Sequence, residues 1–133
     1  MITGIIVAHG NLAEELLSTA RMIFGEFTDV HSMSNAQKSP QALTEDLDAI
    51  VVTALDAGAE GVVILTDFFG GSCSHACLGV EQIHERVRLV TGVNLPMLLA
   101  FLYRRNEVSF AKLPGELVER GLKSIQELDT ENL

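Results

Sequence analysis

The side chains best suited to chemistry in this sequence are a histidine and an aspartate that each follow a short apolar run. His9 comes after residues 2–8, and Asp67 comes after residues 61–66. A carboxylate bonded to one imidazole nitrogen fixes the tautomer of the ring and leaves the other nitrogen free as a nucleophile. It also stabilises the positive charge that develops on the ring. The pair suits a histidine that accepts a group and passes it on.

A glycine-rich turn opens a predicted helix shortly after the aspartate. Gly70, Gly71 and Ser72 would present backbone N–H groups and one hydroxyl at the start of this helix. The N-terminus of a helix is a favourable place for an anion such as a phosphoryl group. Gly10 directly follows the histidine and opens another predicted helix. We therefore predict that these four residues bind a phosphoryl group, in chemistry that needs no metal and no cofactor.

Alternating apolar patterns indicate the elements that must position these residues. Short apolar runs predict strands, and longer stretches with apolar residues at helical spacing predict helices. The predicted strands cover residues 2–8, 28–33, 61–66 and 86–91, and the predicted helices cover residues 11–24, 39–57, 72–84, 96–104 and 114–128. In the last helix, six residues should face inward: Leu117, Val118, Gly121, Leu122, Ile125 and Leu128.

The alternation of strands and helices predicts an α/β fold, with a mainly parallel sheet between two helical layers. Right-handed crossovers favour four parallel strands in the order 2-1-3-4. The sequence leaves open whether a further strand is added at the edge of the sheet. Ligands bind such sheets at the carboxyl ends of the strands where the order reverses, here between the first and third strands. His9 and Asp67 should meet at that edge. A length of 133 residues fits one domain, residues 1–133.

Charge and hydropathy exclude several classes of partner. The formal net charge of −9 argues against nucleic acid and anionic lipid, which both need a basic surface. No apolar run approaches the length of a membrane span, and the first residues lack the basic region of a signal peptide. We therefore expect a cytoplasmic protein whose cysteines stay reduced.

Three neighbouring residues raise the question of a metal site. They are Cys73, His75 and Cys77, each two residues after the one before. This spacing is not a usual zinc pattern, and residues two apart on a helix point in different directions. We predict no metal site here, and a hydrolase built on His9, Asp67 and His75 would lack a convincing third ligand.

Other conspicuous side chains have structural explanations. Phe68 and Phe69 form either an apolar patch that faces a partner or part of the core. His31 and His84 are expected at the surface. The arginine pair at residues 104–105 is expected to be a solvated helix end rather than a contact patch.

Three ordered segments resemble the IIA component of the mannose family of the bacterial phosphoenolpyruvate-dependent sugar phosphotransferase system (PTS). They are IVAHG at residues 6–10 followed by AEELL at 13–17, LTDFFGGS at 65–72, and TGVNLPML at 91–98. The segments occur in family order and near family spacing, and the resemblance extends from residue 1 to about residue 128.

This resemblance implies a role for each site residue. His9 matches the histidine that the phosphocarrier HPr phosphorylates at Nε2. Asp67 matches the carboxylate that orients Nδ1, and Ser72 matches the hydroxyl that helps to bind the phosphoryl group. The phosphoryl group would then pass to a histidine of a IIB protein or domain. From there it would reach a sugar during uptake through the membrane subunits IIC and IID, so that contact with the membrane is indirect.

The resemblance also implies a homodimer, and it leaves some points open. This chain has Phe68 and Phe69 where relatives often have a Thr-Trp pair, and Cys73 where they usually have proline. Because the chain stops soon after its last predicted helix, we expect no fused IIB domain. The sugar cannot be read from a IIA domain, and neither can a role in uptake as opposed to regulation. The alternative class is a small α/β module that binds a metabolite or nucleotide, but the sequence has neither GxGxxG after its first strand nor GxxxxGK[ST].

Overall fold

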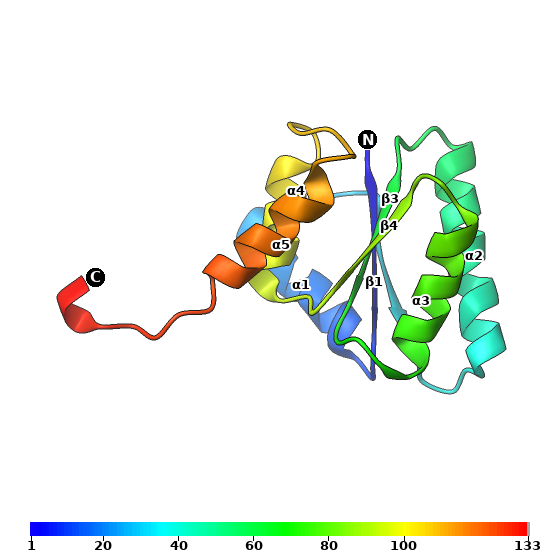
Figure 1. The fold of residues 1–133 in the computed structure, drawn as a ribbon, viewed down its shortest axis with the longest axis horizontal. Coiled ribbons are helices and arrows are strands. Elements are labelled where there is room, and N and C mark those ends of the chain that lie inside the picture. Colours follow the sequence, from blue (N-terminus) through cyan, green and yellow to red (C-terminus); the bar gives the residue numbers. More distant parts are fainter. Residues whose placement is uncertain (133) are drawn as a thin grey trace.

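The computed structural model describes residues 1–132, which alternate between strands and helices as expected (Figure 1). The strands are β1 (Thr3–Ala8), β2 (Val30–Ser34), β3 (Val62–Thr66) and β4 (Val87–Thr91). The helices are α1 (Leu12–Phe24), α2 (Pro40–Asp56), α3 (Gly71–Ile83), α4 (Leu95–Arg104) and α5 (Leu113–Lys123), followed by the short 3₁₀ helix η1 (Thr130–Asn132).

The four strands form one parallel sheet in the order β2-β1-β3-β4, so the prediction of strand order is confirmed. No fifth strand joins this sheet within residues 1–132. In the register of β1 and β3, Val7 lies opposite Thr66. The residues that follow these two strands therefore meet at the same edge, where the strand order reverses.

The sheet lies between two helical layers, as Figure 1 shows: α1, α4 and α5 cover one face, and α2 and α3 cover the other. Alternate residues of β1 serve the two sides of the core. Ile6 and Ala8 pack towards the first layer, and Ile5 and Val7 pack towards the second. This alternation is the period of two of a strand that is buried on both faces.

Local signals in the sequence explain where two of the helices begin. The Ser39 hydroxyl accepts a hydrogen bond from the Ala42 N–H (3.1 Å), and Pro40 occupies the first turn of α2. At α4, the Asn94 side chain accepts one from the Met97 N–H (2.9 Å). Both are N-caps that satisfy backbone donors left free by the first turn.

The prediction for the last helix was wrong beyond its first half. Helix α5 ends at Lys123, and Leu117 is buried, as is Gly121. Four of the residues predicted to face inward are exposed instead: Val118, Leu122, Ile125 and Leu128. Val118 and Leu122 lie within α5 but on its exposed side, whereas Ile125 and Leu128 come after the end of the helix, where the chain runs away from the sheet (Figure 1).

The expectation of a solvated arginine pair was also wrong for one of its members. Arg105 is buried and connects elements that are far apart in the sequence. Its Nη2 donates to the Thr28 carbonyl (2.8 Å), and its Nη1 donates to the carbonyls of Ile2 (3.3 Å) and Asp29 (3.4 Å). Its role is therefore structural, because it satisfies carbonyl groups around the start of β1.

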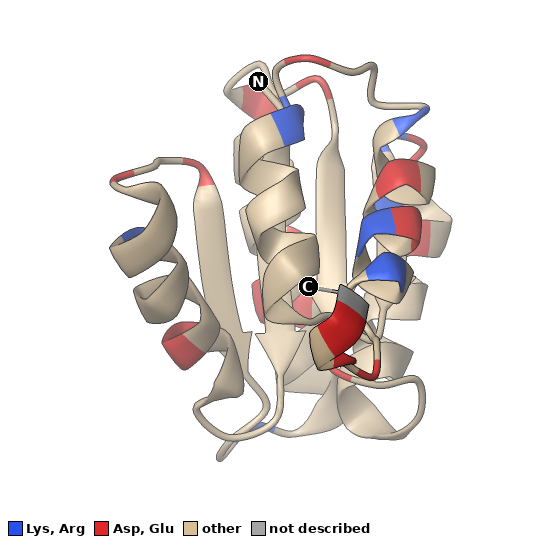
Figure 2. Cartoon of the chain, turned by 90° about the vertical axis from the view of Figure 1, so that its left-hand side faces the viewer, with Lys and Arg blue, Asp and Glu red and all other residues tan. Residues whose placement is uncertain are grey.

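Charge is distributed unevenly over the layer formed by α1, α4 and α5. Figure 2 looks onto this layer and shows few charged residues on α4, which lies between α1 and α5, and many on α5. Within the described residues, no helix combines the length and the apolar character that crossing a bilayer requires.

Candidate functional site

The structure brings His9 and Asp67 together at the carboxyl ends of β1 and β3. The His9 Nδ1 lies 2.8 Å from the Asp67 Oδ2. The two residues are 58 positions apart in the sequence and meet because their strands are neighbours in register. This contact leaves Nε2 as the ring nitrogen that is free to react.

Asp67 is held firmly by backbone groups as well as by the imidazole. The His9 N–H donates to its Oδ2 (3.0 Å), and the Phe68 N–H donates to its Oδ1 (3.0 Å). Burial alone raises the pKa of the Asp67 carboxyl, but these hydrogen bonds and the charge of His9 outweigh burial and keep that pKa below its usual value of 3.8. The carboxylate is therefore fixed in position and ionised at neutral pH.

The free nitrogen of His9 faces the glycine turn that opens α3. A Cβ atom added to Gly71 would lie 3.8 Å from the His9 Nε2. Gly70 and Gly71 have φ values of 132° and 76°, which residues other than glycine rarely adopt. The first turn of α3, which contains Ser72, thus begins next to the reactive nitrogen, and the unpaired N–H groups of a first helical turn favour an anion there.

Not every predicted donor of this turn points outward. The Gly70 N–H donates to the Ser74 hydroxyl (2.8 Å), and that hydroxyl donates to the Gly71 carbonyl (3.3 Å). Gly70 therefore shapes the turn by its backbone conformation, while its N–H is already engaged inside the protein. Gly71 and Ser72 remain the residues of this turn that can offer donors to a phosphoryl group.

Gly10 directly follows the histidine and has a φ of 57°. Its N–H donates to the side chain of Asn35 at the long distance of 3.4 Å. Asn35 also bonds to the end of β1, through its own N–H and the Ala8 carbonyl (3.4 Å). Sequence reasoning did not single out Asn35, which follows β2 without any motif of its own.

An aromatic ring covers one face of the imidazole. The rings of Phe68 and His9 stack with centroids 5.0 Å apart and an angle of 17° between their planes. Phe68 is 53% exposed and Phe69 is 68% exposed, so neither belongs to the core. The sequence left open whether these two residues were surface or core, and their position directly after Asp67 was the signal that they border the site.

Comparisons with known proteins identify the family and the fold of the chain. The family described as "PTS system fructose IIA component" matches residues 3–118. The chain belongs to this IIA family. The mannose-specific EIIAB component of Escherichia coli (strain K12) is 33% identical over 126 residues, which are 93% of this chain and 38% of that protein. The sorbose-specific EIIA component of Lacticaseibacillus casei is 28% identical over 117 residues, covering 86% of this chain and 82% of that protein.

Solved structures of IIA proteins share the fold. The EIIA component from Streptococcus agalactiae superposes with a TM-score of 0.86 at 23% identity and covers both chains completely. The mannose/sorbose-specific IIA subunit from Enterococcus faecalis gives a TM-score of 0.80 at 26% identity, over 96% of this chain and 94% of that one. The resemblance to the mannose class and the predicted α/β architecture are thereby confirmed.

The cysteines of this IIA family member are buried beside the site. Cys73 and Cys77 are free thiols, whereas His75 between them is exposed, so the three side chains do not converge. Burial, with smaller contributions from Cys73 and Asp67, raises the pKa of the Cys77 thiol to about 12. Cys77 is therefore protonated and unreactive at neutral pH.

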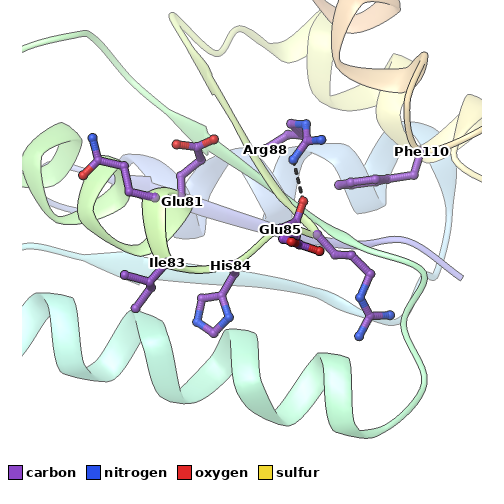
Figure 3. Close-up of a pocket in the computed structure, with 8 residues that line it drawn as sticks. Glu81, Ile83, His84, Glu85, Arg88 and Phe110 are labelled. Atoms are coloured by element: carbon purple, nitrogen blue, oxygen red, sulfur yellow. Dashed lines mark hydrogen bonds between the residues drawn. The ribbon is translucent and has the colours of Figure 1, made fainter.

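A second histidine–carboxylate pair lies at the far end of α3. His84, expected at the surface, is half-buried, and its Nε2 lies 2.7 Å from the Asp48 Oδ1. It lines a shallow pocket that also contains Arg88, whose Nη1 donates to the Glu85 carbonyl (2.7 Å; Figure 3). This pocket is at the amino end of β4, away from His9.

Proposed function

We propose that this chain is a phosphoryl carrier of the PTS. It accepts a phosphoryl group on the His9 Nε2 from phosphorylated HPr and passes it to a histidine of a IIB protein or domain. The observation that carries the proposal is the imidazole held by a carboxylate at Nδ1, with Nε2 facing the glycine turn of α3. The family match supports it over a module that only binds a metabolite or nucleotide.

In the proposed reaction, Asp67 prepares the imidazole before the phosphoryl group arrives. Nδ1 carries the ring proton and donates a hydrogen bond to the carboxylate, so the lone pair is on Nε2. As Nε2 forms its bond to phosphorus, the bond from phosphorus to the donor histidine breaks and its electron pair returns to the donor. The ring becomes cationic, and the ionised Asp67 stabilises that charge.

The phosphoryl oxygens would be held at the start of α3. Gly71 and Ser72 would donate backbone N–H groups, and the Ser72 hydroxyl would add another donor. Gly70 sets the course of the backbone at this turn, and Gly10 has open space where a side chain would be. Because the same contacts serve arrival and departure, the group can leave for a IIB histidine by the reverse displacement.

The finer biological setting follows from the resemblance. The chain would act in the cytoplasm as one IIA domain over residues 1–133, without a cofactor. It would reach the membrane only through IIC and IID, either in sugar uptake or in a regulatory chain. Its net charge of −9 favours a basic protein partner.

We also propose that the chain forms a homodimer, as the resemblance implies. The exposed apolar residues at and after α5 support this proposal, because association would remove them from water: Val118, Leu122, Ile125 and Leu128. Light scattering of the purified chain tests the proposal, and a monomer at all concentrations would contradict it.

Reconstitution tests the proposed function directly. The full chain is incubated with phosphoenolpyruvate, enzyme I and HPr, and intact mass is measured with HPr omitted as the control. We expect one phosphoryl group that is labile in acid and that appears only with HPr. A chain that takes up no acid-labile phosphate would refute the proposal.

A further inference from the structure

Two side chains hold the imidazole of His9, one at an edge of the ring and the other on a face. The Asp67 Oδ2 lies 2.8 Å from Nδ1, and Phe68 stacks on a ring face. A single hydrogen bond fixes one edge of a ring but allows the ring to tilt about that bond. A flat ring stacked on the face opposes this tilt.

Phe68 is itself tied to Asp67 through its backbone. Its N–H donates to the Asp67 Oδ1 (3.0 Å), so the residue that covers the imidazole also fixes the carboxylate that bonds to it. A Cβ atom added to Gly70 would lie 3.7 Å from the Phe68 Cε2. The phenyl ring therefore lies close both to the imidazole and to a backbone position that has no side chain.

Burial does not explain why Phe68 takes this position. The residue is 53% exposed, so its ring gains less from leaving water than a core phenylalanine does. Its neighbour Phe69 is 68% exposed and makes no ring stack within the described residues. The two residues are thus phenylalanines of the same loop, but only Phe68 contacts the His9 ring.

We propose that Phe68 is a positioning residue for phosphoryl transfer: it holds the plane of the His9 imidazole so that Nε2 stays directed at the space beside Gly71. This inference rests on the proposed function of His9. Displacement at phosphorus needs the attacking nitrogen, the phosphorus and the leaving nitrogen in line, so loss of ring alignment slows the step. Phe68 does not touch the phosphoryl group and acts only through the imidazole.

The test compares Phe68→Ala, Phe68→Leu and Phe68→Tyr with Phe69→Ala as the matched control. Single-turnover transfer is followed at saturating HPr that has been phosphorylated with enzyme I and phosphoenolpyruvate. Since a stacked aromatic pair contributes about 0.5–1.5 kcal/mol, we expect Phe68→Ala to be about 2- to 13-fold slower at saturation. Phe68→Tyr keeps a ring and should restore the rate, and Phe69→Ala should stay within about twofold of the wild type.

A spectroscopic measurement separates positioning from a general structural effect. In the unphosphorylated protein, the ring current of Phe68 should shift the carbon-bound protons of the His9 imidazole upfield. Phe68→Ala and Phe68→Leu should lose this shift, whereas Phe68→Tyr and Phe69→Ala should keep it. The loss of the shift and the loss of rate should occur in the same variants.

Several results would overturn the inference. One is a Phe68→Ala variant whose transfer rate at saturation is unchanged, or in which only the KM for phosphorylated HPr changes. Another is a Phe68→Leu variant whose transfer rate equals that of the wild type. A wild-type chain that accepts no phosphate would instead refute the proposed function, and the inference with it. An active wild type with an equally fast Phe68→Ala variant would refute the inference alone.

Discussion

Two histidine–carboxylate pairs lie at opposite ends of α3, and their distances are almost the same. His9 Nδ1 is 2.8 Å from Asp67 Oδ2, and His84 Nε2 is 2.7 Å from Asp48 Oδ1. The surroundings differ. His9 faces the N-terminus of α3, where the helix dipole favours an anion. His84 is the C-cap of the same helix, where the dipole favours a cation.

The support of the carboxylates differs as well. Asp67 follows a strand, is only 10% exposed and accepts two backbone hydrogen bonds. Asp48 lies within α2 and is more exposed. Under the proposed function only His9 reacts, so a short histidine–aspartate distance does not by itself make a reactive site. A fixed carboxylate, a free nitrogen and an anion-binding helix start must coincide.

The largest effect should separate the two histidines. We expect His9→Gln to abolish phosphorylation in the reconstituted system, because no other group of the site replaces Nε2. His84→Gln should be phosphorylated like the wild type. Intact mass of both variants gives the answer, and equal phosphorylation of His9→Gln would refute the site assignment.

The two carboxylates should differ next. Asp67→Asn keeps the shape of the side chain but removes the charge that stabilises the cationic ring, so the transfer rate should fall about 10²-fold. Asp48→Asn should leave the rate unchanged. Rapid-quench measurement of transfer from phosphorylated HPr compares them, and similar rates in both variants would contradict the account.

Helix α3 should be sensitive to substitution at Gly71, its first residue, and tolerant at Gly79 in its interior. Gly71→Ala places a methyl group 3.8 Å from Nε2 and forces alanine to a φ of 76°. We expect transfer to slow about tenfold, and stability to fall by about 1–2 kcal/mol. Gly79→Ala meets nothing within 4 Å and should stabilise the helix by up to about 1 kcal/mol. Equal effects of both substitutions on the transfer rate would show that Gly71 has no special place.

Acid should weaken the contribution of Asp67 to stability. Its folded-state pKa is lowered, so the stabilisation is present above the usual value of 3.8 and is lost as pH falls through the lower folded-state pKa. The difference in free energy of unfolding between the wild type and Asp67→Asn should shrink over that range. Urea unfolding at several pH values measures it, and a difference that stays constant down to the most acid pH would be inconsistent with the lowered pKa.

The smallest effect should be the coupling between His84 and Asp48. A partly exposed ion pair contributes about 0.2–1 kcal/mol, so a double-mutant cycle with His84→Ala and Asp48→Ala should give a value in this range. Thermal or urea unfolding of the four proteins provides the cycle. A coupling several times larger would contradict this expectation and would mean that the pair contributes strongly to the stability of the α2–α3 contact.

Much of the fold and of the site could be predicted because the signals are local. Apolar runs and helical spacing predicted the strands and helices, and parallel strands with right-handed connections predicted the sheet order. Once the order was known, His9 and Asp67 had to meet, since each directly follows a strand at the point where the order reverses.

Long-range contacts explain what the sequence could not predict. Arg105 bonds to carbonyls 76 to 103 residues away, and nothing around it distinguishes it from a solvated arginine. His84 pairs with Asp48 across two helices. The stack of Phe68 on His9 depends on the exact course of one loop, and the exposed apolar residues after α5 depend on where that helix leaves the sheet.

Locating the phosphoryl group on the imidazole tests the central claim most directly. The chain is labelled with ¹⁵N at histidine and phosphorylated through enzyme I and HPr, and the nitrogen bonded to phosphorus is identified by NMR. The account predicts phosphorus on Nε2 of His9, with Nδ1 still protonated and bonded to Asp67. Phosphorus on Nδ1, or on His84 or any other residue, would contradict it.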